Sequence, residues 1–389
     1  MRADEEREQA GVRAEEPVTI LTVAREAGVS KTTASDALRG SGRVSERTRE
    51  AVAQVAERLG YVPNGSARHL RKASTGTIGL HVPEVLTRSN YYMSFVFGVV
   101  EQAARHDYDV TLITSGQRRS RPPRVDGLVL GDPLGGDPVV ESLMATGLPT
   151  VSCERFPGSR QADGVVWSEH ASMLARLLDH LRESGASRPA LIVAGDESDW
   201  AGSVHRGYLE WCAAHGVVPL VRRVSFDAPG DEVRAAARAL LDAAGGSGRG
   251  AEQGDGRPSG RGVGRGDGRS ASRDVGQGPD EAALGRGGDG PLDALVCAPA
   301  GAATEVAPLL REAGVNVLLA SCVDSAATRL ADPPITAIDL RPKEAGASCA
   351  ELLFELLSGA APVGTERVHP IELSVRASTR PRLQRISRS

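Results

Sequence analysis

The sequence predicts a two-part α/β protein, in which an N-terminal three-helix helix-turn-helix domain and a hinge helix precede two doubly wound α/β subdomains. Residues 18–63 hold three short segments with apolar residues at helical spacing, separated by turn signals. Beyond residue 75, strand and helix patterns alternate over about 300 residues, which is more than one sheet accommodates. The 389 residues are 40% hydrophobic, which is ample for such cores.

A tight turn joins the first two predicted helices. Residues 20–27 carry apolar residues at helical spacing, and Thr19 precedes them as the N-cap. Gly28 ends this helix, because glycine tolerates the left-handed conformation. Ser30 caps a second helix over residues 31–39. Two short helices joined in this way have the geometry of a helix-turn-helix motif.

A third helix and a short connecting segment complete the N-terminal part. Two glycines break the second helix, and Ser45 caps the third, whose apolar stripe ends at Gly60. We assign residues 18–63 to the helix-turn-helix domain and 64–74 to a hinge helix or linker. The sequence NGSARHLRK within this linker is too short to be a stable helix alone.

Residues 75–380 form the predicted α/β core. Strands are expected near 76–82, 108–114, 125–130, 148–152, 163–167, 189–194, 219–225, 292–297, 315–320, 335–339 and 369–375. Helices are expected near 90–106, 136–146, 168–184, 202–215, 229–243, 302–313 and 341–358. This alternation predicts mostly parallel sheets with helices on both faces.

Some stretches depart from this pattern. Residues 115–124 join two predicted strands without a helical pattern. Residues 245–290 hold 17 Gly, seven Arg and seven Asp/Glu, so we expect a disordered surface insert. Because it follows a helix and precedes a strand, we expect it at the end of the sheet opposite the ligand edge. An RNA-binding Arg-Gly segment is the alternative, although the seven acids neutralise the arginines. The tail of residues 1–17 is also expected to be disordered, and 381–389 form a C-terminal tail.

Charge is distributed unevenly along the chain. The formal net charge is only −4, yet residues 18–74 carry ten Lys/Arg against five Asp/Glu, a net +5. The rest of the chain is acidic. A compact basic module on an acidic body is expected when one domain alone contacts phosphates.

The sequence offers no sign of a secreted, membrane-spanning or cofactor-bearing protein. The N-terminus lacks the apolar segment of a secretory signal, and no apolar run reaches the ~20 residues that cross a membrane. We therefore expect a cytoplasmic protein without cofactor or metal. The cysteines lack metal-site spacing and are read as buried reduced thiols, with a redox or metal site as the alternative: Cys153, Cys212, Cys297, Cys322 and Cys349.

Catalytic motifs are missing from the sequence. It contains no phosphate-binding G-x-x-x-x-G-K-[ST] loop, no G-x-S-x-G nucleophile elbow and no H-E-x-x-H zinc motif. The eight histidines are dispersed. We therefore expect that the protein is not an enzyme.

The N-terminal residues resemble the DNA-binding domain of the LacI/GalR family of transcriptional regulators. The resemblance rests on VTILTVAREAGVS, GRVSERTREAV and ERLGYVPNGSARHLR, which follow in register over residues 18–74. The core over residues 75–380 is more loosely similar to the family's periplasmic-binding-protein-like core, through TIGLHVP, RVDGLVL and ADPPIT.

The second helix presents short polar and basic groups on one face, as a recognition helix does toward base edges and phosphates. The resemblance places Lys31, Thr32 and Asp36 at base-reading positions. It implies further DNA contacts by Thr19, Ser30, Thr33, Ser35, Arg39 and Thr48. The alternative is a set of solvated polar residues on a small helical domain.

Asp36 departs from the family, which commonly has Arg at this position. Phosphates repel a carboxylate, but it can accept a hydrogen bond from cytosine N4. The alternative is an acid that turns toward Lys31 or Arg39.

The linker resembles the family's hinge helix, which folds when two subunits meet over the minor groove. Leu70 aligns with a wedging leucine, and Asn64, Ala67 and Arg71 flank it. An apolar wedge that unstacks a base step is a known minor-groove device. A plain linker is the alternative.

The resemblance implies that a small effector, with a sugar as one candidate, binds between the two subdomains. Ligands of α/β sheets gather at the carboxyl ends of strands. This rule selects Pro83, Asn90, Tyr91, Glu154, Trp167, Trp200, Arg206 and Asp324.

Three positions depart from the family's effector anchors. Val204 replaces an Arg, Ala298-Pro299 replaces an Asn-Asp pair, and Val323 replaces an acid. These changes leave open a different ligand or none.

The sequence thus predicts a cytoplasmic homodimer that binds a palindromic double-stranded DNA operator as a transcriptional regulator, most simply a repressor. A homodimer is expected because one helix-turn-helix buries too little DNA surface for tight specificity. The C-terminus lacks the heptads of a tetramerising tail. The alternatives are a DNA-binding regulator with an effector-independent core and a solute-binding receptor.

Overall fold

The computed structural model of the 389-residue chain describes residues 18–61, 74–83, 90–114, 121–195, 198–245 and 291–380. The chain divides into two compact units, residues 1–74 and 75–389, and each is described by itself. Within the described residues, no helix combines the length and hydropathy needed to cross a membrane. The predicted terminal tails, most of the hinge segment and nearly all of the Gly-rich insert lie outside the described residues.

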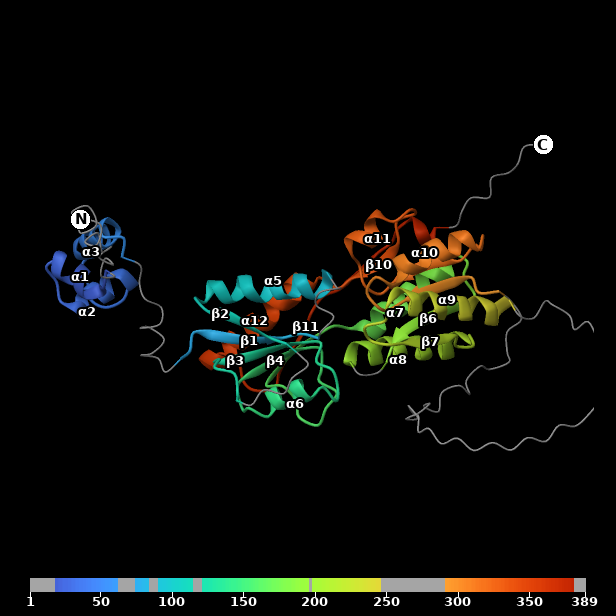
Figure 1. Cartoon of the computed structure of the whole chain (residues 1–389), viewed down its shortest axis with the longest axis horizontal. Helices are drawn as coiled ribbons and strands as arrows, with labels where there is room; N and C mark the ends of the chain where they lie inside the picture. Colours follow the sequence, from blue (N-terminus) through green and yellow to red (C-terminus); the bar gives the residue numbers. More distant parts are fainter. Residues whose placement is uncertain are drawn as a thin grey trace, which may run out of the picture. The chain divides into compact units, whose positions relative to one another are not determined.

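The first unit is a three-helix domain with orderly helix caps (Figure 1). Its helices are α1 (Ile20–Glu26), α2 (Lys31–Arg39) and α3 (Glu46–Arg58). Thr19, Ser30 and Ser45 are the N-caps, as predicted, and each side chain accepts a hydrogen bond from the backbone N–H three residues on. Gly28 has φ +65°, the left-handed conformation expected at the turn. The buried core comprises Val23, Ala24, Ala34, Ala37, Val52 and Ala56.

The second unit contains two six-stranded sheets. The first has the order β11-β5-β4-β3-β1-β2 and is parallel throughout. Its strands are β1 (Thr77–His81), β2 (Asp109–Ile113), β3 (Gly127–Gly131), β4 (Thr150–Cys153), β5 (Gly164–Trp167) and β11 (Thr365–Val368). The second has the order β12-β10-β9-β8-β6-β7, with only β12 antiparallel. Its strands are β6 (Pro189–Ala194), β7 (Val221–Val224), β8 (Ala294–Cys297), β9 (Leu318–Ser321), β10 (Thr336–Asp339) and β12 (Glu372–Ser374).

Helices cover both faces of the first sheet. Its helices are α5 (Asn90–Arg105), α6 (Pro138–Met144) and α12 (Pro342–Ser358). Successive side chains of a strand point to opposite faces. Val129 packs with α5 and α12, whereas its neighbours Leu128 and Leu130 pack with α6. This arrangement explains why β3 is buried along its whole length and reads as a continuous apolar run.

The second sheet is covered in the same way. Its helices are α7 (His170–Glu183), α8 (Asp199–His215), α9 (Gly230–Gly245), α10 (Ala302–Glu312) and α11 (Ala326–Leu330), and a 3-10 turn η2 (Ala377–Thr379) follows β12. Leu191 and Val193 pack with α7 and α8, whereas Ala190 and Ile192 pack with α9 and α10. Burial of both faces again explains the apolar sequence of β6.

The chain crosses between the two sheets three times. It passes from β5 to α7, returns from β10 to α12, and crosses again from β11 to β12. His369, in the third crossover, donates its backbone N–H to Trp167 O at the end of β5. The crossovers therefore lie together between the two subdomains.

The predicted fold class is confirmed, with two differences in detail. One strand was expected over residues 369–375, but the chain forms β11 in the first sheet and β12 in the second. The sequence pattern did not reveal this, because strand partnership depends on tertiary pairing. The short helix α11 was also unexpected. No helix forms among the described residues of the 115–124 segment, and residues 115–120 lie outside them.

Candidate functional site

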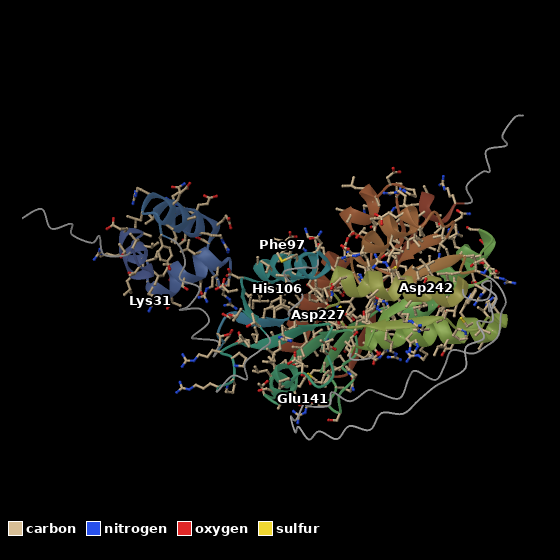
Figure 2. All side chains as sticks on the ribbon, turned by 45° about the vertical axis from the view of Figure 1, so that its right-hand side comes forward. Lys31, Phe97, His106, Glu141, Asp227 and Asp242 are labelled. Atoms are coloured by element: carbon tan, nitrogen blue, oxygen red, sulfur yellow. The ribbon has the colours of Figure 1, made fainter. Side chains whose placement is uncertain are left out.

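The second helix of the N-terminal domain presents one polar face. Lys31 and Thr32 are exposed, whereas Ala34 and Ala37 are buried against the other helices. The Lys31 side chain extends from the helix surface (Figure 2). The burial pattern thus divides α2 into an inner and an outer face, as a recognition helix requires.

The N-cap hydroxyls of this domain are organised in pairs. The hydroxyls of Ser30 and Thr33 lie 2.8 Å apart, and those of Ser45 and Thr48 are also 2.8 Å apart. Ser30 and Ser45 are exposed. Hydroxyls and backbone N–H groups at exposed helix N-termini suit contacts with phosphate oxygens.

Asp36 forms an ion pair within its own helix. Arg39 Nη2 donates to Asp36 Oδ1 at 3.0 Å, and Arg39 Nε donates to Ser35 O at 3.0 Å. Gly42 lies against this carboxylate, since a Cβ at Gly42 would be 2.9 Å from Asp36 Oδ2. Asp36 is therefore paired with Arg39, one of the two partners named in the alternative to base reading. The predicted hinge residues Asn64, Ala67, Leu70 and Arg71 lie outside the described residues.

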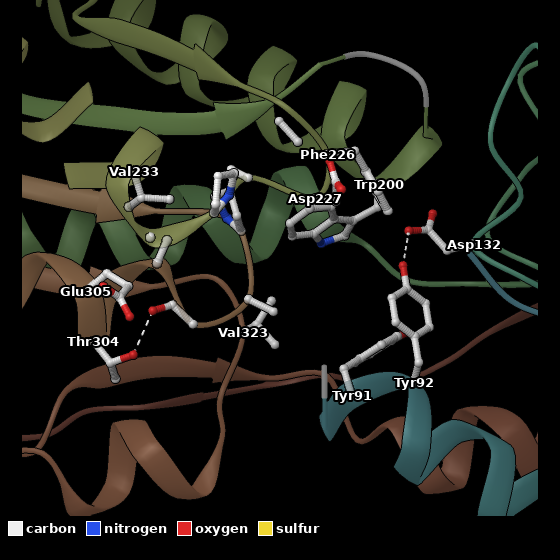
Figure 3. Close-up of a pocket in the computed structure, with 18 of the residues that line it drawn as sticks. Tyr91, Tyr92, Asp132, Trp200, Phe226, Asp227, Val233, Thr304, Glu305 and Val323 are labelled. Carbon is white, nitrogen blue, oxygen red and sulfur yellow. Dashed lines mark hydrogen bonds between the residues drawn. The ribbon is translucent and has the colours of Figure 1, made fainter. Parts of the chain in front are cut away.

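A cavity of about 450 Å³ lies in the second unit, at the carboxyl ends of strands from both sheets (Figure 3). Asp132 and Glu154 directly follow β3 and β4. Residues 226–230 follow β7, residues 299–302 follow β8, and Val323 follows β9. This position matches the general rule for ligand sites in α/β sheets.

Three of the eight predicted effector residues line the cavity, namely Tyr91, Glu154 and Trp200. The other five lie outside its lining: Pro83, Asn90, Trp167, Arg206 and Asp324. Arg206 is an exposed residue of α8 that donates to Ser203 Oγ at 3.0 Å. Trp167 lies beneath the Arg155 guanidinium, 4.0 Å from the ring centroid.

Asp324 has a structural role. Both nitrogens of the Arg376 fork donate to its carboxylate, at 2.7 and 2.8 Å, and Arg329 Nε donates at 2.9 Å. Burial alone would raise the pKa of Asp324, but these donors and Thr328 lower it to about 2. This carboxylate ties the C-terminal residues after β12 to the start of α11, and it does not face the cavity.

Asp132 is the most perturbed acid of the cavity. It is 7% exposed and takes the left-handed conformation at φ +48°. Tyr92 Oη donates to Asp132 Oδ2 at 3.0 Å. Burial, followed by the neighbouring Glu154 carboxylate, raises the pKa of Asp132 to about 7. Near neutral pH, this acid is therefore poised between its two protonation states.

Glu154 is held by a buried histidine. His170 Nε2 lies 2.9 Å from Glu154 Oε1. Burial alone would lower the pKa of His170, but the attraction of Glu154 and then Asp132 raises it. An imidazolium at this position offsets the charge of Glu154.

Acids and aromatic rings dominate the wall. Its four carboxylates are Asp132, Glu154, Asp227 and Glu305, and its four aromatic rings are Tyr91, Tyr92, Trp200 and Phe226. None of the described lining residues is Lys, Arg or His. Two of the four carboxylates have a basic partner, since Arg234 pairs with Glu305 and His170 pairs with Glu154. Such a wall disfavours anionic ligands.

Sequence reasoning missed Tyr92, Asp132, Phe226, Asp227 and Glu305. Asp132 follows the apolar run GLVLG directly, as Glu154 follows TVSC, so the strand-end rule that selected Glu154 also selects Asp132. The three positions at which apolar residues replace the family's polar effector-binding residues lie in different places in the structure. Val323 and Pro299 line the cavity, whereas Val204 is buried in the core of the second subdomain.

The cysteine side chains form no disulfide bond among the described residues. All five cysteines are buried and unpaired. Among the described residues, no group of three or more His, Cys, Asp or Glu side chains is placed to hold a metal ion.

Family models match both units of the chain. The model described as "Bacterial regulatory proteins, lacI family" matches residues 19–64, and the model described as "Periplasmic binding protein-like domain" matches residues 178–379. These matches cover the helix-turn-helix domain and the larger part of the α/β core.

Curated relatives are transcriptional regulators by name. The HTH-type transcriptional regulator RafR of Escherichia coli is 30% identical over 54% of this chain and 65% of its own length. Catabolite control protein A of Priestia megaterium is 32% identical over 38% of this chain and 47% of its own. The regulator CelR of Thermobifida fusca is 34% identical over 58% and 70%. The alignments thus span less than two thirds of RafR and of the catabolite control protein.

Solved structures share the fold over nearly the whole chain. A CelR–cellobiose complex has a TM-score of 0.60 and 25% identity, and the match covers 93% of this chain and 99% of that one. A lac repressor dimer bound to operator and the anti-inducer ONPF has a TM-score of 0.67 and 19% identity, with coverage of 94% and 100%.

Proposed function

Because this chain belongs to the LacI family of bacterial regulatory proteins, we propose that it is a sequence-specific transcriptional regulator and not an enzyme. It binds a palindromic DNA operator as a homodimer, represses transcription from the cytoplasm, and responds to a small-molecule effector in the cavity of its core. The observation that carries this proposal is the combination, in one chain, of a basic helix-turn-helix domain with a strand-end cavity between two α/β subdomains.

DNA binding is assigned to the outer face of α2 and to the helix N-termini. Lys31 and Thr32 are exposed at the N-terminal end of α2, where a recognition helix contacts base edges. The hydroxyls at the helix N-termini contact phosphates, which fix register without reading sequence. By the sequence resemblance, Leu70 is the minor-groove wedge, and Asn64, Ala67 and Arg71 flank it; these four residues lie outside those that the structure describes.

Dimerisation is assigned to an apolar face of the first subdomain. Met93, Phe97 and Val100 recur at helical spacing on one side of α5 and are all exposed. Phe97, which is labelled in Figure 2, is 55% exposed. Leu112, also exposed, belongs to the edge strand β2, which packs beside α5. An apolar face of this kind suits a second copy of the chain.

Effector control is assigned to the cavity between the sheets. Residues of both subdomains line it, and three crossovers connect those subdomains. A ligand that contacts both walls favours their closed arrangement by its differential affinity. Because a structure of CelR contains cellobiose, we take polyhydroxylated, sugar-like compounds as the first class of effector to test for this chain.

Selection of binding sites from random duplex DNA with the full-length protein tests the core of this proposal. We expect enrichment of a two-fold symmetric site, and Lys31→Ala should weaken binding to that site by about tenfold, or 1.4 kcal/mol. Arg58→Ala, at the exposed C-terminal end of α3, is the matched control with the same loss of charge. If no symmetric site is enriched, the protein is not a dimeric operator-binding regulator.

A DNA-binding regulator with an effector-independent core is the second candidate. It is favoured by Val323 and Pro299, which line the cavity at positions where the family carries polar anchors. Thermal-shift screening of the full chain against sugars, amino sugars and nucleosides distinguishes the two, because only a ligand-binding core is stabilised by a ligand.

A further inference from the structure

The cavity wall holds four carboxyl groups, and none of its described residues is cationic. His170 lies behind Glu154, and Arg234 lies behind Glu305. Asp132 has no ion pair among the described residues: the neutral Tyr92 hydroxyl donates to it, the neutral Ser198 hydroxyl lies nearby, and His170 attracts it only at longer range. A ligand that enters this cavity therefore meets a carboxyl group that no cationic side chain contacts directly.

Two buried polar atoms of the wall lack hydrogen-bond partners among the described residues. They are Asp132 Oδ1, an acceptor, and Trp200 Nε1, a donor. Buried polar groups in native proteins are almost always paired, so unpaired ones in a cavity wall point to a missing partner. A ligand pairs both atoms if it brings an N–H or O–H donor to Asp132 Oδ1 and a hydrogen-bond acceptor to Trp200 Nε1.

Aromatic rings surround the same part of the cavity. Tyr92 places its hydroxyl on Asp132, and Tyr91 and Trp200 line the wall nearby (Figure 3). The rings of Tyr91 and Tyr92 meet edge to face, with centroids 5.1 Å apart. Ring faces attract cations and also stack on the C–H faces of sugars. The arrangement therefore suits a positively charged group attached to a carbohydrate-like body.

We propose that this cavity binds a hydroxylated amine of the amino-sugar class. Its ammonium group hydrogen-bonds to Asp132, and one of its oxygens accepts from the Trp200 indole N–H. The inference rests on the proposed function, in that it takes the cavity as the effector site and names the chemistry of the ligand. Phosphorylated and carboxylated compounds are disfavoured, because the wall is acidic and none of its described residues is cationic.

Calorimetric titration of the full-length protein with matched disaccharides tests this assignment. The probes are the β-1,4-linked glucosamine dimer and cellobiose, which differ only in two amino groups in place of hydroxyls. Cellobionic acid serves as the anionic probe. We expect the amine to bind at least about tenfold more tightly than cellobiose at pH 7, and cellobionic acid not to bind. Equal or tighter binding of cellobiose, or no binding of the amine, overturns the proposal.

Two variants locate the interaction. Asp132→Asn retains an acceptor for Tyr92 but removes the charge, so the preference for the amine should disappear. Asp242→Asn makes the same change on the exposed surface of α9 and should keep the full preference. Trp200→Phe keeps an aromatic ring but removes the N–H, and it should weaken both disaccharides by a similar factor. An amine preference that survives in Asp132→Asn overturns the assignment of the ammonium site.

Operator binding separates this inference from the proposed function. The selected operator is titrated with protein in the presence of each disaccharide. If the amine binds in an Asp132-dependent manner but leaves operator affinity unchanged, the regulatory role fails and the ligand assignment stands. If cellobiose alone changes operator affinity, the regulatory role stands and the ligand assignment fails.

Discussion

Asp132 should make the ligand-free protein less stable as the pH rises. Burial, and then Glu154, raise its pKa from 3.8 to about 7. A carboxyl whose pKa is higher in the folded than in the unfolded state binds more protons when folded, so stability falls between about pH 4 and pH 7. Each pKa unit corresponds to about 1.4 kcal/mol, and the shift of about three units therefore lowers the free energy of unfolding by up to about 4 kcal/mol above pH 7.

Asp132→Asn removes this cost and keeps an acceptor for Tyr92. We expect the variant to be more stable than the wild type by about 2–4 kcal/mol at pH 8, with a difference that shrinks toward zero near pH 4. Urea denaturation of the full-length protein at several pH values, followed by far-UV circular dichroism, measures the difference. Asp242→Asn is the control, because Asp242 is exposed on α9.

The sign of the pH dependence is the decisive result. A variant that is less stable than the wild type at pH 8, or a difference that does not change with pH, would show that Asp132 is already compensated in the free protein. The argument for a cationic ligand would then lose its electrostatic support.

Three further predictions concern helix packing, dimerisation and DNA recognition. Gly98→Ala should lower the free energy of unfolding by about 1–3 kcal/mol, because its Cβ would lie 1.9 Å from Lys343 O at the crossing of α5 and α12. Gly202→Ala has open space around its Cβ and should stabilise α8 by up to about 1 kcal/mol. Urea denaturation of both variants measures the two changes. Phe97→Asp should convert dimers to monomers in sedimentation velocity, and Leu209→Asp on the exposed surface of α8 should not; a dimeric Phe97→Asp protein would exclude α5 from the interface. Asp36→Ala should change the base selected at one operator position in binding-site selection, and an unchanged preference would refute base reading.

The sequence predicted the two-subdomain core because central parallel strands are buried on both faces. GLVLG in β3, PALIVA in β6 and ALVC in β8 are continuous apolar runs, each buried along its whole length. The exposed edge strand β2 was placed from the alternation of elements. The split between β11 and β12 was not predictable in this way, because both are short and mostly polar, and only their partners assign them to different sheets.

The sequence predicted where the cavity lies, but it predicted only some of the residues that line it. The strand-end rule correctly pointed to Glu154, and it would have found Asp132 had it been applied to every strand. Arg206 and Asp324 were selected as charged residues near expected strand or helix ends, but local partners engage their charges. Whether a charged side chain faces a cavity or a neighbouring residue depends on packing between distant segments, which the order of residues along the chain does not show.

Helix α5 connects the two surfaces assigned to effector binding and dimerisation. Its first turn carries Tyr91 and Tyr92 on the cavity wall, and the same helix exposes Met93 and Phe97. Its close crossing with α12 at Gly98 leaves little room for independent movement of the two helices. A ligand that draws Tyr92 and Asp132 toward the opposite subdomain therefore acts on a rigid helix pair, not on a loop. In the proposed dimer, a movement of this helix pair would shift the apolar face of α5, and a changed pairing of the two subunits would alter the spacing of their DNA-binding domains.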